Sequence, residues 1–123
     1  MRADVRTLAP LGTVVPMLVA SAVAEVAAWA VACAPGTLAG AWYGRAEVLA
    51  VVHLVTLGTI ATAIVGAGWQ IVPVVTTRPW RPSLAREVNG ALIAAVPVLV
   101  WGFWSRGPVG HAAAGIAVLA LGV

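Results

Sequence analysis

Residues 53–73, HLVTLGTIATAIVGAGWQIVP, decide the fold of this chain. The stretch is predominantly apolar, and about 20 apolar residues of helix are enough to cross a bilayer. Within it, Gly58, Thr62 and Gly66 follow one another at intervals of four, so a helix places them along one face. A second helix can approach such a face of small residues closely. The sequence therefore predicts a membrane-spanning helix that packs tightly against a neighbour.

The composition of the whole chain agrees with this prediction. Of the 123 residues, 62% are hydrophobic and 9% are charged, against roughly 45–50% and 25% in soluble domains. The net charge is +3, but the arginines lie in short segments between apolar runs rather than along one face. Nucleic-acid binding is therefore not expected. Cys33 is the only cysteine, which excludes an intrachain disulfide.

Four apolar runs predict an all-α integral membrane protein, organised as a single helical domain over residues 1–123. The expected spans are 11–34, 47–75, 84–105 and 109–123. Two prolines in the segment 76–87 are expected to keep that segment out of a helix. The last run covers roughly 21 Å of helix, less than a hydrocarbon core of about 30 Å. We therefore expect a bundle of about four transmembrane helices whose fourth is short or truncated, completed by a longer chain or by a partner.

The distribution of arginines predicts the orientation. Arg2, Arg6 and the three arginines of the segment 76–87 fall on one side of the membrane, and Arg45 and Arg106 fall on the other. The side with more positive charge is expected to face the cytoplasm. The sequence thus predicts a multi-pass protein of the cell inner membrane with a cytoplasmic N-terminus.

Two histidines are the first candidate functional residues, because ionisable residues within a bilayer are rare and often functional. His53 is expected roughly 9 Å below the outer end of the second span, and His111 opens the fourth span. Both imidazoles then fall in the outer half of the membrane, where two facing rings could bind a haem iron axially. The alternatives are a neutral His53 ring bonded to a threonine or a carbonyl, and a His111 that simply lies at the interface.

Glu25 is the third candidate, with Ser21 and Trp29 four residues to either side of it. A lone carboxylate in mid-membrane costs a few kcal/mol unless it is protonated, paired or hydrated. We interpret Glu25 either as a proton-relay group, in a haem protein or a small transporter, or as a buried acid bonded to a threonine of the second span. Asn89 and Gln70 are expected to bind backbone groups near the cytoplasmic side.

The second span also resembles a known helix. His53 followed by GAGWQIVP, residues 66–73, is similar to helix two of haem-copper oxidase subunit I and its nitric-oxide-reductase-like relatives. Asn89 and Pro97 are placed like the asparagine and proline of that family's third helix. The resemblance covers residues 50–105.

The resemblance implies a low-spin b-type haem in respiratory electron transfer, with His53 as axial ligand and Gly66 and Gly68 in the cofactor site. The family's chain is much longer, and the helices that carry its remaining haem and copper ligands have no counterpart here. No catalytic residue is therefore expected in this chain alone. The second axial ligand would be His111 or would come from a second copy.

An alternative function has no cofactor. The chain could be a non-catalytic assembly or interaction module of the membrane, which packs through Gly58, Thr62 and Gly66. Under either hypothesis the expected partners are the lipid bilayer and other transmembrane helices, in a homo-oligomer or with other membrane subunits.

Overall fold

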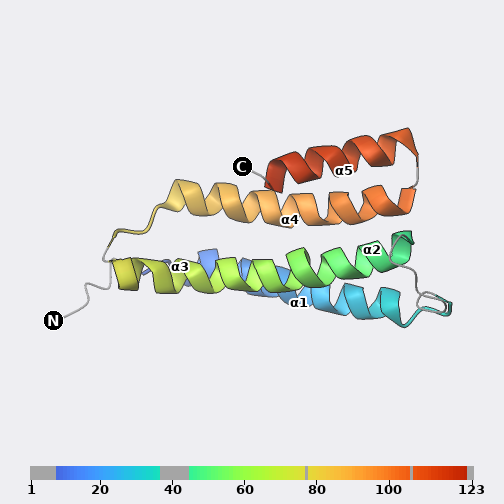
Figure 1. Cartoon of the computed structure of the whole chain (residues 1–123). Helices are drawn as coiled ribbons and strands as arrows, with labels where there is room; N and C mark the ends of the chain where they lie inside the picture. Colours follow the sequence, from blue (N-terminus) through green and yellow to red (C-terminus); the bar gives the residue numbers. More distant parts are fainter. Residues whose placement is uncertain (1–7, 37–44, 77, 106, 122–123) are drawn as a thin grey trace.

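The computed structural model describes residues 8–36, 45–76, 78–105 and 107–121. These residues form four helical rods that run alongside one another (Figure 1). The first rod is α1 (Leu11–Ala32) and the last two are α4 (Pro82–Ser105) and α5 (Pro108–Leu121). The second rod is continuous but has three parts, α2 (Ala46–His53), the π-helix η2 (Leu54–Ala61) and α3 (Thr62–Thr76).

The all-α membrane fold predicted from the sequence is confirmed within the described residues. Three helices are long and apolar enough to cross a membrane: Leu11–Ala32, Ala46–Thr76 and Pro82–Ser105. The fourth, α5, has 14 residues and is about 21 Å long at the rise of an α-helix, so it is short as expected.

The start of α4 differs from the expectation. The segment 76–87 was expected to stay non-helical because of its prolines, but α4 already begins at Pro82. The first turn is closed by the backbone N–H of Ala85, which donates to the carbonyl of Arg81 at 3.1 Å. Proline is well suited to the first helical position, because the N–H that it lacks would have no partner there. The expectation was wrong for residues 82 and 83, since the third span was expected to begin at residue 84.

The face of small residues on the second rod packs against α1, as the spacing predicted. Gly58, Thr62 and Gly66 are all buried. A methyl group added at Gly58 would lie 2.6 Å from Cβ of Ala24, and one added at Gly66 would lie 3.0 Å from Cβ of Met17. The close neighbour of the second span is therefore α1 of the same chain.

Helices α4 and α5 form an antiparallel hairpin, and α4 packs against the second rod and also touches α1 (Figure 1). Ala95 and Leu99 of α4 form a buried cluster with Ala117 of α5. A second cluster joins α4 to the rest of the bundle, since Val96 packs with Leu54 and with Ala24 and Ala28 of α1. Within the described part of the chain α5 packs chiefly on α4.

Hydrogen bonds tie three rods together at the other end of the bundle. Asn89 of α4 accepts a bond from the indole N–H of Trp69 at 2.8 Å and donates to the carbonyl of Thr13 at 3.0 Å. Gln70 donates to the carbonyl of Ala9 at 2.9 Å. The structural role expected for Asn89 and Gln70 is confirmed.

Candidate functional site

His53 ends α2 and is half-buried. Its Nδ1 lies 2.7 Å from the carbonyl oxygen of Leu49, one turn earlier. Because a carbonyl can only accept, Nδ1 carries the proton, and in the neutral ring the lone pair is on Nε2. Metal-binding histidines are commonly oriented in this way, with the second ring nitrogen donating to a carbonyl. The sequence also allowed a structural histidine, with a neutral ring bonded to a threonine or a carbonyl. The hydrogen bond to Leu49 agrees equally with that alternative.

The aromatic ring of Phe103, on α4, packs against the imidazole of His53. The two ring centroids are 4.8 Å apart, and the ring planes are inclined by 48°. Phe103 thus covers part of the half-buried histidine and connects α2 to α4 at this level of the bundle.

His111 lies in the first turns of α5 and is exposed. It lines a pocket of about 450 Å³ between α2, α4 and α5, together with Arg45, Leu49 and Phe103. His53 is not among the described residues that line this pocket. Phe103 therefore packs against His53 and lines the same pocket as His111, but the structure does not place the two imidazoles in one cavity.

The two candidate glycines lie far from His53. Gly66 follows it by 13 residues, which is about 20 Å of helix, and is packed against Met17. Gly68 has open space on its Cβ side. The structure does not bring Gly66 or Gly68 to the histidine. Among the described residues there is also no group of three or more His, Cys, Asp or Glu side chains that could hold a metal ion.

Glu25 is half-buried on α1. Its Oε1 accepts a hydrogen bond from the indole N–H of Trp29 at 2.8 Å. The partner is thus a neighbour one turn away on the same helix rather than the threonine of the second span that one interpretation expected. Thr59 and Thr62 donate instead to carbonyls of their own rod.

The π-helix η2 begins directly after His53 and was not foreseen from the sequence. Such wide turns are rare and are often found at functional sites. Here side-chain hydroxyls support the wide turn, because Thr59 donates to the carbonyl of Leu54 at 3.3 Å and Thr62 to that of Leu57 at 3.2 Å, each five residues earlier. Ser21 of α1 donates to the carbonyl of Thr59 at 3.0 Å and so joins η2 to α1.

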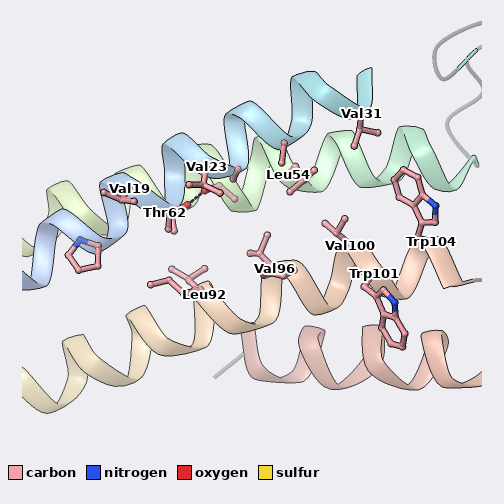
Figure 2. Close-up of a pocket in the computed structure, with 17 residues that line it drawn as sticks. Val19, Val23, Val31, Leu54, Thr62, Leu92, Val96, Val100, Trp101 and Trp104 are labelled. Atoms are coloured by element: carbon pink, nitrogen blue, oxygen red, sulfur yellow. Dashed lines mark hydrogen bonds between the residues drawn. The ribbon is translucent and has the colours of Figure 1, made fainter. Parts of the chain in front are cut away.

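A larger hollow lies between α1 and α4, which we call the α1–α4 groove (Figure 2). Its volume is about 700 Å³, and Leu54, Gly58 and Thr62 of the second rod also line it. Nothing in the sequence pointed to it, because it depends on how far α1 and α4 stand apart.

Comparison with known proteins gave no match to a family model, to a curated protein or to a solved structure. The resemblance to haem-copper oxidase subunit I thus rests on the sequence pattern alone and stays a prediction.

Proposed function

We propose that this protein binds a b-type haem near the outer end of its helical bundle, with His53 as an axial ligand, and serves respiratory electron transfer in the cell inner membrane. The observation that carries the proposal is the hydrogen bond from Nδ1 of His53 to the carbonyl of Leu49. This hydrogen bond leaves the Nε2 lone pair for an iron ion and fixes the orientation of the ring relative to α2. The proposed orientation has a cytoplasmic N-terminus, as the arginine distribution predicts.

The second axial ligand is proposed to be His111 or a residue of a second copy. His111 already lines a pocket of about 450 Å³, within the range of 300–1,000 Å³ typical of ligand pockets. Arg45 lines the same pocket and pairs with the carboxylate of Glu47 at 3.7 Å, so a haem propionate would have to share or replace this partner. A bound haem would supply one-electron transfer, for which the chain contributes ligands and an apolar environment.

Phe103 limits this arrangement, because its ring packs against the imidazole of His53. A haem bound to His53 would have to share the space beside the imidazole with this ring. Phe103→Ala should therefore raise the fraction of protein that carries haem, whereas Phe103→Leu, which retains bulk, should raise it less.

An absorption spectrum tests the proposal. The protein should be expressed with added haem, purified in a mild detergent and recorded in the oxidised and reduced states. We expect a Soret band that His53→Ala abolishes. His111→Ala should convert a low-spin spectrum to a high-spin one if His111 is the second ligand. A colourless wild-type protein of normal helix content would refute haem binding.

The second candidate is a membrane assembly module without a cofactor. The face of small residues is already covered by α1, so association would use another surface than Gly58, Thr62 and Gly66. Helix α5 supports this candidate, since the apolar side chains of Val109 and Leu119 are 71% and 72% exposed. A colourless protein that forms a specific cross-linked oligomer through cysteines introduced at these two positions would favour it, whereas a monomer would argue against it.

A further inference from the structure

A short connection joins the second rod to α4 at one end of the bundle (Figure 1). Helix α3 ends at Thr76, and α4 begins at Pro82. The second rod and α4 are both long and apolar enough to cross a membrane, so the connection between them lies at a membrane surface. We call residues 78–86 the α3–α4 junction. We propose that this junction binds the phosphate group of an anionic phospholipid.

The α3–α4 junction carries positive charge that the described part of the chain does not neutralise. Arg78, Arg81 and Arg86 are exposed, and none of them forms an ion pair with another described residue. The acidic residue next to them is Glu87, which is also exposed. Residues 78–87 contain three arginines and one glutamate and so have a net charge of +2. An anionic ligand would supply the missing counter-charge.

The length of α4 places these arginines at the level of the lipid headgroups. Its 24 residues correspond to about 36 Å at helical rise, which is about 6 Å longer than the hydrocarbon core. The rise from Pro82 to Arg86 accounts for about 6 Å. Arg86 thus lies at the edge of the hydrocarbon core, and Arg78 and Arg81 lie outside it. Lipid phosphates are concentrated at this level, where basic residues next to a membrane span attract anionic lipids. This favours a lipid over a free anion.

The residue types at the α3–α4 junction suit a phosphate. A guanidinium group can donate two parallel N–H bonds to phosphate oxygens. Arg81 directly precedes the first residue of α4, and the N-terminus of a helix also favours negative charge. Arg81 and the start of α4 therefore act on an anion from the same side.

Trp80 provides a second and independent observation at the α3–α4 junction. Its side chain is half-buried, and its buried indole N–H has no hydrogen-bond acceptor among the described residues. A buried donor without an acceptor is unfavourable, and tryptophans at membrane interfaces commonly bond to polar groups there. In the proposed complex the indole ring turns its N–H towards an oxygen of the lipid that Arg81 binds. A diffuse attraction between arginines and an anionic surface would not involve this N–H.

Native mass spectrometry of the full chain tests the proposal. The delipidated protein is incubated in a mild non-ionic detergent with dioleoylphosphatidylglycerol or with dioleoylphosphatidylcholine, which differ in headgroup charge but not in acyl chains. We expect the chain to retain the anionic lipid in preference to the zwitterionic one. Arg78→Gln and Arg81→Gln should each lower retention of the anionic lipid about fivefold, the contribution of one basic residue near an anionic surface. Trp80→Phe keeps an aromatic ring but removes the N–H, and it should also lower retention about fivefold.

Two further variants serve as controls. Trp104→Phe makes the same exchange near the other end of α4 and should leave retention unchanged. Glu87→Gln removes the neighbouring negative charge and should raise it. Circular dichroism should show equal helix content in all variants.

Equal retention of the two lipids would overturn the proposal. Loss of binding in the arginine variants but not in Trp80→Phe would indicate a diffuse attraction and would also overturn it. Release of the lipid by inorganic phosphate alone would show a site for a free anion instead. The outcome is independent of whether the protein binds haem.

Discussion

A single methyl group at Gly58 should test the packing of α1 on the second span. In Gly58→Ala the new Cβ would lie 2.6 Å from Cβ of Ala24 and 3.4 Å from a methyl of Val96. Carbon atoms normally approach to about 3.5–4.0 Å, so α1 must shift by roughly 1 Å. Overpacking of this kind costs about 1–3 kcal/mol. Replacing glycine by alanine in a helix meanwhile contributes about 0.5–1 kcal/mol in the opposite direction.

Gly68→Ala is the control for the stabilisation that comes from replacing a helical glycine by alanine. Gly68 lies on the same rod and has no atom near the position of the added methyl group, so this variant should be stabilised by about 0.5–1 kcal/mol. The difference between the two variants then reports the clash, and we expect Gly58→Ala to be less stable than Gly68→Ala by about 1–3 kcal/mol. Unfolding by SDS in mixed micelles, followed by far-ultraviolet circular dichroism, measures both. Equal stabilities would show that α1 does not approach the second span at Gly58, and the packing described above would be wrong.

Three further predictions concern single side chains. Asn89→Leu should cost about 1–3 kcal/mol, because the indole N–H of Trp69 and the carbonyl of Thr13 lose their partner; unchanged stability in the same SDS titration would contradict the network. Ser21→Ala should cost about 0.6 kcal/mol, the average for hydrogen bonds between membrane helices, and amide exchange in η2 should become faster; slower or unchanged exchange would argue against the bond to the Thr59 carbonyl. Cys33 is exposed at the end of α1, so in the proposed orientation an impermeant maleimide should label it in intact cells, and labelling only after lysis would reverse the orientation.

The positions of the helices follow from local properties of the chain. The length of each apolar run determines whether it can span a bilayer, and prolines and glycines separate the runs. The regular spacing of Gly58, Thr62 and Gly66 also predicted a close helix contact, which Ala24 and Met17 of α1 provide. These features could be predicted because each depends only on residues within one contiguous helix.

The candidate site shows the limit of that reasoning. The sequence predicted His53 and His111 in the same half of the membrane. It did not predict that Phe103 packs against His53 and lines the pocket of His111. Spacing along one helix cannot say which side chain of a neighbouring helix will fill the space next to it. That choice depends on the rotation of α4 about its own axis, which is set by its packing on α2 and α5.

The sequence by itself thus determined an all-helical protein with three helices long and apolar enough to cross a membrane, and the face of small residues, because hydrophobic length and helical period are properties of contiguous residues. Only the tertiary structure decided that α1 covers this face, that Phe103 contacts His53 and that a groove opens between α1 and α4. The physical reason is that these features depend on the distance and rotation between helices, which arise when side chains from distant parts of the chain pack together.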